Sequence, residues 1–263
     1  MHTTLFVYSA TGNSYHVAKR IADALGDTEI ILLPYRGEVK ASERIGIISP
    51  VYHWVTPKVT SEFILNQLSQ TETRSIGYLF CIHTYGGAYG YAPMGTEMLL
   101  QDIGCLSSYQ NKVKMPDTYI PLFSIPTKRK YDAIYDKAEK RIDAIIRDIQ
   151  EEKIKVSFKL PLGKSLKNIM TRVSYKTYQS YGEQLSVSDA CIKCGKCVRL
   201  CPNKNITWKQ GEKPRFGEDC LACFACLLGC PESAIGYGPK HKTARYPNER
   251  SECRTVLGCR HGF

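Results

Sequence analysis

Eight cysteines that form two copies of one spacing pattern constrain this chain more than any other feature. They lie between residues 191 and 230, and a shift of 29 positions carries the first four onto the second four. The proline after the fourth cysteine repeats in the same register. The first copy is Cys191, Cys194, Cys197, Cys201 and Pro202, and the second is Cys220, Cys223, Cys226, Cys230 and Pro231. This register indicates a duplicated unit.

The spacing within each copy, C-x2-C-x2-C-x3-C-P, is typical of proteins that hold two 4Fe–4S clusters. Three thiolates close in sequence bind three irons of one cube, and the fourth cysteine ligates the other cluster. The pattern therefore predicts two ligand sets. The first ligand set is Cys191, Cys194, Cys197 and Cys230; the second ligand set is Cys220, Cys223, Cys226 and Cys201. Small residues between ligands, such as Gly195, Ala222 and Ala225, allow backbone N–H groups to approach the sulfurs.

Two other interpretations of the cysteines are weaker. Zinc sites also use C-x2-C pairs, but zinc does not explain a third cysteine at the same spacing followed by C-P, repeated twice. A disulfide scaffold would spread its cysteines through a small secreted domain, whereas the first 150 residues contain only Cys81 and Cys105. The N-terminus lacks the features of a secretory signal, and no apolar run is long enough to span a bilayer. We therefore expect a cytoplasmic protein without a membrane span.

The first 150 residues alternate short apolar runs with longer amphipathic ones. Expected strands cover residues 5–8, 30–33, 45–49 and 76–82, with a weaker fifth at 107–115; expected helices cover 15–25, 59–68, 90–103 and 131–149. Continuous apolar runs are typical of strands buried on both faces. Alternation of this kind predicts an α/β fold with a doubly wound parallel five-stranded sheet. The next stretch, residues 151–185, is basic and rich in tyrosine, which indicates a connector with a helix near 166–178.

The segment from Ser188 to Gly238 resembles the ferredoxin portion of a family in which a flavodoxin-like domain is fused to a two-cluster bacterial-type ferredoxin, the EFR-type ferredoxins. The stretches Val187-Ser188-Asp189, 191–197 and 230–235 carry the resemblance. It implies a flavodoxin-like FMN domain over 1–152, a basic connector over 153–185 and a small α+β ferredoxin domain over 186–240. Residues 241–263 have no assigned role.

A hydroxyl-rich loop follows the first expected strand directly. It consists of Ser9, Ala10, Thr11, Gly12, Asn13 and Ser14, and a helix begins at its end. Backbone N–H groups at a helix N-terminus bind phosphate, and a glycine permits the unusual dihedrals of such a loop. No lysine or arginine is present, so the loop would neutralise a dianion through dipoles and hydrogen bonds. This pattern is similar to the flavodoxin phosphate loop.

Two further loops should lie beside this one, because a flavodoxin-like sheet binds FMN where its strand order switches. The third strand leads into Pro50, Val51, Tyr52, His53 and Trp54, and the fourth into His83, Thr84, Tyr85, Gly86 and Gly87. Tyr52, Trp54 or Tyr85 would stack on the flavin ring, and backbone groups of 84–87 would bond its edge. For His53 and His83 we favour loop histidines without a catalytic role over proton donors.

The remaining cysteines give weaker signals. Cys81 and Cys105 are expected to be buried as small apolar side chains. Cys253 and Cys259, together with His261, would form a redox pair or an extra metal site, but a surface tail is the favoured interpretation.

The net charge of the chain indicates a protein partner rather than nucleic acid. The formal charge is +11, and two loaded clusters and a flavin phosphate lower it to about +5.

An acidic redox partner, such as a ferredoxin or an iron–sulfur oxidoreductase of an anaerobic metabolism, suits this charge better than nucleic acid. Lys193, Lys196, Arg199 and Lys204 lie beside the first cysteine run, either to dock that partner or simply as a solvated surface. A homodimer is left open.

The sequence favours electron transfer between two 4Fe–4S clusters and FMN. The alternatives are a flavin-dependent reductase of a small electrophile fed by its own ferredoxin domain, and an iron–sulfur sensor or binding module.

Overall fold

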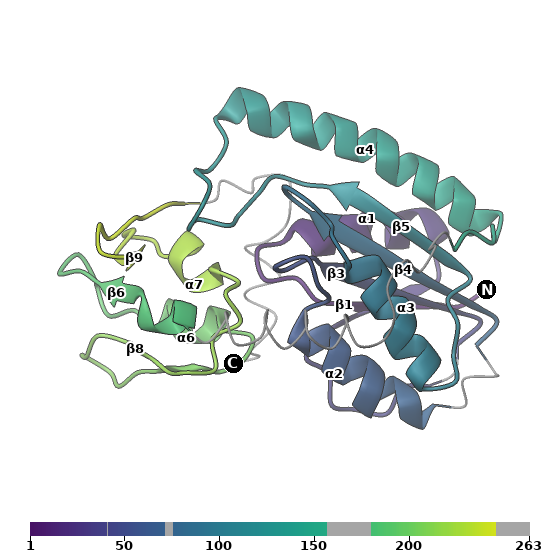
Figure 1. Cartoon of the computed structure of the whole chain (residues 1–263), viewed down its shortest axis with the longest axis horizontal. Coiled ribbons are helices and arrows are strands. Elements are labelled where there is room, and N and C mark those ends of the chain that lie inside the picture. The colour runs from purple at the N-terminus through teal and green to yellow at the C-terminus, as the bar shows by residue number, and fades with distance from the viewer. Residues whose placement is uncertain (41, 72–75, 157–179, 246–263) are drawn as a thin grey trace.

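A computed structural model describes residues 1–40, 42–71, 76–156 and 180–245. The chain forms a sheet with helices on both faces, and a smaller part that lies beside the carboxyl ends of the strands (Figure 1). The helix expected near 166–178 and the tail with Cys253, Cys259 and His261 lie outside the described residues. None of the described helices is long and apolar enough to cross a membrane.

The sheet has five parallel strands in the order β2-β1-β3-β4-β5. They are β1 (Thr3–Val7), β2 (Thr28–Leu32), β3 (Arg44–Pro50), β4 (Tyr78–Tyr85) and β5 (Tyr109–Lys114). All five residues of β1 are buried, as the continuous apolar runs predicted. This strand order is that of flavodoxin-like sheets, which confirms the expected fold class.

Successive side chains of β1 point to opposite faces and enter two separate cores. Leu5 and Val7 pack with helices α1 (Asn13–Leu25) and α4 (Lys128–Gln150). Phe6 and Tyr8 pack on the other face. The helices there are α2 (Lys58–Asn66), which is followed by the short 3-10 helix η1 (Leu68–Gln70), and α3 (Ala92–Asp102). The sheet is thus covered on both faces.

Strand β4 extends three residues beyond its expected end at residue 82. His83, Thr84 and Tyr85 pair with β5 in parallel register, and His83 and Thr84 also pair with β3. The polar His-Thr-Tyr sequence breaks the apolar run, but the ladder on both sides satisfies its backbone. The loop after β4 therefore begins at Gly86.

The C-terminal part is a small α+β unit, as expected. Strand β6 (Leu185–Val187) pairs antiparallel with β9 (Ile235–Tyr237), and β7 (Ile206–Thr207) pairs with β8 (Arg215–Phe216). Two short helices, α6 (Lys196–Leu200) and α7 (Ala225–Leu228), each begin within one cysteine run. The backbone thus repeats the duplication of the sequence.

The two parts are packed against each other. Leu221 is 5% exposed and belongs to the core formed with α2 and α3. Ala10, after β1, packs with Ala225 of α7. Nζ of Lys242 donates hydrogen bonds to the carbonyls of Ile120 (2.7 Å) and Phe123 (3.0 Å), both in the segment after β5. Apolar and polar contacts therefore fasten the C-terminal part to the sheet.

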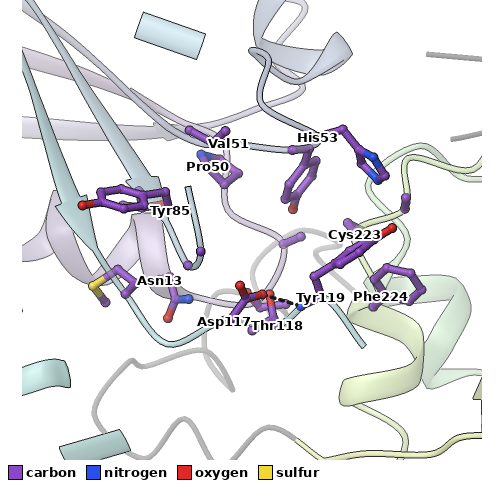
Figure 2. Close-up of a pocket in the computed structure, with 18 of the residues that line it drawn as sticks. Asn13, Pro50, Val51, His53, Tyr85, Asp117, Thr118, Tyr119, Cys223 and Phe224 are labelled. Atoms are coloured by element: carbon purple, nitrogen blue, oxygen red, sulfur yellow. Dashed lines mark hydrogen bonds between the residues drawn. The ribbon is translucent and has the colours of Figure 1, made fainter. Parts of the chain in front are cut away.

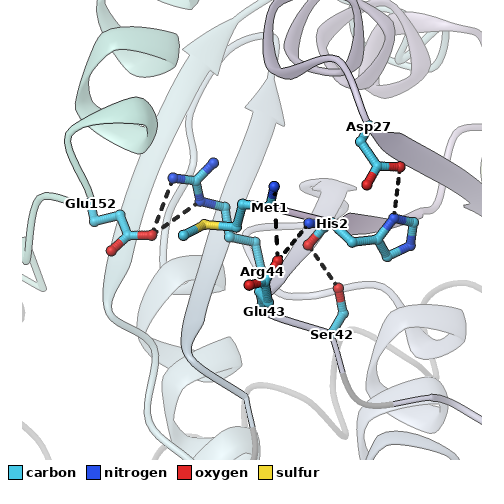
Figure 3. A network of polar contacts seen from close by, with 7 residues as sticks. All are labelled: Met1, His2, Asp27, Ser42, Glu43, Arg44 and Glu152. Carbon is cyan, nitrogen blue, oxygen red and sulfur yellow. Dashed lines mark hydrogen bonds and ion pairs between the residues drawn. The ribbon is translucent and has the colours of Figure 1, made fainter.

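A polar network ties the opposite edge, where β1 and β3 begin (Figure 3). The His2 backbone N–H donates to Oε2 of Glu43 (2.7 Å), and Nδ1 of the His2 ring contacts Asp27 (3.0 Å). Arg44 bonds Oε1 of Glu152, just after α4, at 3.1 Å. This network links the starts of β1 and β3 to the loop before β2 and to the end of α4.

Candidate functional site

A cavity of about 470 Å³ lies at the carboxyl ends of the strands (Figure 2). All the residues predicted to bind the cofactor line it except Gly12. They are Ser9, Ala10, Thr11, Asn13, Ser14, Pro50, Val51, Tyr52, Trp54, Thr84, Tyr85, Gly86 and Gly87. Three loops that are distant in sequence therefore meet at the switch point of the sheet. Cofactor binding by these residues stays a prediction.

The loop after β1 has the backbone of a helix N-terminal site. Gly12 is the N-cap of α1 with φ of 94°, in the left-handed region that glycine adopts without strain. Oγ of Ser9 accepts a hydrogen bond from the Tyr15 N–H at 3.2 Å. The Ser14 and Thr84 hydroxyls bond each other at 2.8 Å, which ties the loop to β4. Gly12 shapes the loop rather than lining the cavity.

A tight turn presents the aromatic side chain of Trp54 at the cavity. His53 and Trp54 both have positive φ, at 46° and 67°, and Tyr52 and Val55 exchange backbone hydrogen bonds around them. Two consecutive left-handed residues that are not glycine store strain, which is characteristic of functional sites. The Trp54 carbonyl accepts a hydrogen bond from the Tyr91 N–H at 2.7 Å, and Trp54 lies directly against Gly90. The Trp54 residue is 59% exposed.

The segment after β5 also lines the cavity, and sequence reasoning missed it. Its members are Met115, Pro116, Asp117, Thr118 and Tyr119. Oδ1 of Asp117 accepts a hydrogen bond from the Tyr119 N–H at 2.8 Å (Figure 2). The Asp117 carboxylate also lies against Gly86. A Cβ atom at Gly86 would stand 2.4 Å from Oδ2 of Asp117. Any larger residue at position 86 would therefore displace the Asp117 side chain.

The far wall of the cavity comes from the C-terminal part. Ala222, Cys223 and Phe224 line it together with Tyr181. The Tyr119 and Tyr181 hydroxyls hydrogen-bond each other, and both rings make edge contacts with Phe224. Burial and the hydrogen bond with Tyr181 raise the pKa of Tyr119, so the Tyr119 hydroxyl is neutral. Aromatic rings thus join the second cysteine run to the cavity.

Each predicted ligand set surrounds its own small cavity. One is lined by Cys191, Cys194, Cys197 and Cys230 of the first ligand set, and the other by Cys201, Cys220, Cys223 and Cys226 of the second. In each case the fourth cysteine comes from the other copy of the repeat. This arrangement fits the crossed ligation expected of a two-cluster unit. Ligation itself stays a prediction.

Backbone N–H groups point at cysteine sulfurs in the same way in both copies. The N–H groups of Lys193 and Ala222 each lie 3.4 Å from the sulfur two residues earlier, on Cys191 and Cys220. Those of Asn205 and Ala234 lie 3.2 and 3.3 Å from the sulfurs of Cys201 and Cys230. Such bonds stabilise bound thiolates and tune a cluster's potential. Ala222 is one of the small residues expected to allow this approach. Gly195, another of them, is the N-cap of α6.

Among the described residues, no group of three or more His, Cys, Asp or Glu side chains is placed to hold a single metal ion. A 4Fe–4S cube binds each thiolate through a different iron, whereas the ligands of one zinc ion all converge on one point. Burial raises the pKa of Cys197 to about 11, and burial also raises the pKa of Cys226 well above its ordinary value. Cluster assembly must therefore release protons from these thiols.

The two histidines near the loops lie in different surroundings. His53 lines the cavity, and burial lowers its pKa, so its ring is neutral at pH 7. His83 is 2% exposed and points to the other face of β4, where its Nε2 bonds Gln110 at 3.2 Å. Gln110 in turn donates to Glu97 of α3 at 2.6 Å. His83 therefore belongs to a buried polar network beneath α3 and not to the cavity.

We expect acidification to destabilise the protein through His83. Burial lowers its pKa to about 4, against about 6.5 in the unfolded chain, so between these values only the unfolded chain takes up the proton. His83 therefore makes its full contribution to the unfolding free energy above pH 6.5. This contribution falls by roughly 2 kcal/mol when the pH is lowered to 5. Anaerobic urea unfolding of the wild type and of His83→Gln at pH 7 and near pH 5 measures this. An equal loss in both proteins would contradict the assignment.

Comparisons with known proteins identify one domain family in the chain. Residues 190–235 match the family of the 4Fe–4S dicluster domain. No curated protein matches the chain. Among solved structures, Megasphaera elsdenii flavodoxin is similar with 16% identity and a TM-score of 0.35, over 42% of this chain and 85% of the flavodoxin.

Two other solved structures show a likeness of the same order. The Trp repressor binding protein of Bacillus subtilis has 12% identity and a TM-score of 0.36, over 53% of this chain and 98% of that one. Rubredoxin oxygen:oxidoreductase from Desulfovibrio gigas has 11% identity and a TM-score of 0.32, over 56% of this chain and 37% of that one. Likenesses at this level say nothing about ligands. The family match does, and residues 190–235 form a 4Fe–4S cluster-binding domain.

Proposed function

We propose that this chain is an electron-transfer protein in which FMN, bound in residues 1–152, exchanges electrons with two 4Fe–4S clusters bound in residues 186–240. Residues 153–185 connect the two domains. The observation that carries the proposal is the shared wall between two cavities. Cys223 and Phe224 line both the large cavity at the sheet and the small cavity of the second ligand set. A flavin and a cluster bound in these cavities would be neighbours.

The large cavity suits FMN on three grounds. The loop after β1 offers backbone N–H groups and hydroxyls at the N-terminus of α1, which suit a phosphate dianion. Aromatic rings from Tyr52, Trp54 and Tyr85 lie where a flat ring system would stack. The carbonyls of Thr84 and Tyr85 accept hydrogen bonds from Val51 and Met115. We therefore assign contact with the flavin edge to the backbone of Gly86 and Gly87.

When bound, FMN accepts electrons singly or in pairs, and each cluster carries one electron at a time. The chain's own residues hold these groups and exclude water between them. Phe224 is 3% exposed and fills the space between the cavity and α7. Ala10 and Ala225, each about 2% exposed, close the contact between the phosphate loop and the second cysteine run. Electrons that pass between the two domains would cross only this layer of buried side chains.

Iron, acid-labile sulfide and released flavin per chain test the proposal directly. Protein purified without oxygen should contain about eight irons, about eight sulfides and about one FMN. About four irons would leave a single cluster and contradict the crossed ligand sets. Full iron without flavin would refute the FMN assignment and leave an α/β domain with another ligand. The released flavin must be FMN rather than riboflavin, because the loop after β1 is assigned to a phosphate.

A further inference from the structure

The two copies of the cysteine repeat carry opposite kinds of side chain at equivalent positions. In the first copy Lys193, Lys196 and Arg199 stand between the ligands. A shift of 29 positions replaces them by uncharged residues, namely Ala222, Ala225 and Leu228. Ile192 corresponds in the same way to Leu221. A duplicated unit therefore has one apolar face and one basic face built on the same backbone pattern.

The apolar face is already occupied within the chain. Leu221 packs into the core beneath α2 and α3, and Ala225 packs against Ala10. Ala222 lines the large cavity beside Cys223. All three side chains are at most 5% exposed. This face is thus the surface through which the second ligand set meets the proposed flavin.

The equivalent basic face of the first copy is open. Ile192, the counterpart of buried Leu221, is 61% exposed. Lys193 and Arg199 are exposed and Lys196 is half-buried. No ion pair within the described residues engages either lysine, and the Arg199 guanidinium reaches only the Cys194 carbonyl, at 3.4 Å.

The first cysteine run, residues 191–201, contains no acidic residue. Glu232 lines the small cavity of the first ligand set. Asp189 is already paired with Lys213 at 2.7 Å. Positive charge therefore dominates around an exposed apolar residue, which is the composition of a docking surface for an acidic protein.

We propose that the face formed by Ile192, Lys193, Lys196 and Arg199 docks an acidic one-electron carrier protein, which exchanges electrons with the cluster that the first ligand set binds. This inference rests on the proposed function and supplies its partner. In each encounter one electron leaves the reduced carrier and arrives at the cluster of the first ligand set. The carrier is oxidised by one electron and the cluster reduced by one, and no bond or proton changes place.

A second copy of this chain fits the face less well than an acidic carrier. The chain is itself basic, with a formal charge of +11 and about +5 after loading. Like charges therefore oppose its self-association at a basic face. An acidic carrier would be steered to the same face, and its association would weaken as salt screens the charges.

Charge reversal of the two lysines tests the proposal on the loaded full chain. The probe is a purified small acidic ferredoxin, and the readouts are its Kd by titration and the rate at which its reduced form reduces the chain. The Lys193→Glu/Lys196→Glu variant should weaken binding and slow that rate by roughly tenfold or more at low salt, and lose most of the salt dependence. For Lys193→Gln/Lys196→Gln, the Kd and the reduction rate should both lie between those of the charge-reversal variant and those of the wild type.

The matched control is Lys137→Glu/Lys140→Glu on the exposed face of α4, which changes the net charge equally. It should bind the carrier as the wild type does. Iron and FMN contents are measured on every variant, and each carrier rate is divided by the rate with a photoreduced neutral flavin analogue. This division separates docking from transfer inside the chain.

Three outcomes would overturn the docking proposal. The first is an equal loss of carrier affinity and rate in the α4 control and in the charge-reversal variant. The second is a carrier rate that the lysine substitutions do not change at any salt concentration. The third is a dimer of this chain, seen by sedimentation, that dissociates in the charge-reversal variant. Each of these can occur while electrons still pass from cluster to flavin, which leaves the proposed function standing. Absence of that internal transfer with the neutral reductant would instead refute the proposed function.

Discussion

A Cys226→Ala variant will retain about four irons of about eight and will lose electron transfer between cluster and flavin. Cys226 belongs to the second ligand set, whose small cavity shares Cys223 and Phe224 with the large cavity. Without the cluster of this set, the nearest remaining iron belongs to the first ligand set. No cluster then lies next to Phe224 on the side away from the proposed flavin.

Cys194→Ala is the matched partner in this experiment. It removes a ligand of the first set, whose cavity shares no residue with the large cavity, and should lose a similar amount of iron. Flash photoreduction, followed at the absorbance of clusters and flavin, should show an internal transfer phase in Cys194→Ala and none in Cys226→Ala. Survival of the phase in Cys226→Ala, or its loss in both variants, would contradict the assignment of the second set as the flavin's neighbour.

Gly90→Ala will weaken FMN binding by about tenfold or more, because the added methyl group has no space. Gly90 has φ of +48°, and a Cβ atom there would lie 2.3 Å from Cβ of Trp54. The turn at His53 and Trp54 is already strained, and it must shift to admit the methyl group. The dissociation constant for FMN, measured by the quenching of flavin fluorescence, reports that shift.

Gly104→Ala provides the control for backbone strain alone. Gly104 has φ of +73°, but no atom lies within 4 Å of the place that its Cβ would take. Both variants pay about 1–2 kcal/mol of unfolding free energy for a left-handed alanine. Only Gly90→Ala should also lose FMN affinity. Equal FMN affinity in the two variants would show that the Trp54 turn does not shape the flavin site.

Much of the fold was predictable because local patterns and tertiary structure agree. The apolar runs of β1 and β3 gave their strands, and Gly26 ended α1 as expected. The cysteine repeat located the cluster-binding domain, since its spacing is dictated by ligation rather than by packing. The two loops after β3 and β4 could be placed beside the loop after β1 because carboxyl ends of parallel strands meet at one edge.

Other parts of the site carry no signal in the local sequence. Asp117 and Tyr119 follow a weak fifth strand, and nothing in their neighbourhood resembles a motif. His83 was expected in a loop because the polar residues after Ile82 interrupt the apolar run, yet the ladder continues to Tyr85. Strand alternation then turns Thr84 toward Ser14 and His83 away from the cavity.

The wall formed by Cys223 and Phe224 was equally beyond the sequence. It depends on how two separately recognisable domains pack, and that packing rests on small side chains such as Ala10 and Ala225. Alanine at such positions is too common to predict an interface. The difference between the two cysteine runs is visible in the sequence, but its meaning emerges only once one run is seen against the sheet.

The contacts of Leu221 and Lys242 with the sheet domain have a consequence for kinetics. A domain on a free tether finds its partner by diffusion, so its transfer rate falls as solvent viscosity rises. Here Leu221 is anchored in the core, and Lys242 holds the carbonyls of Ile120 and Phe123. The two proposed cofactor sites are thus held at a fixed separation, so viscosity should slow only the encounter with an outside carrier.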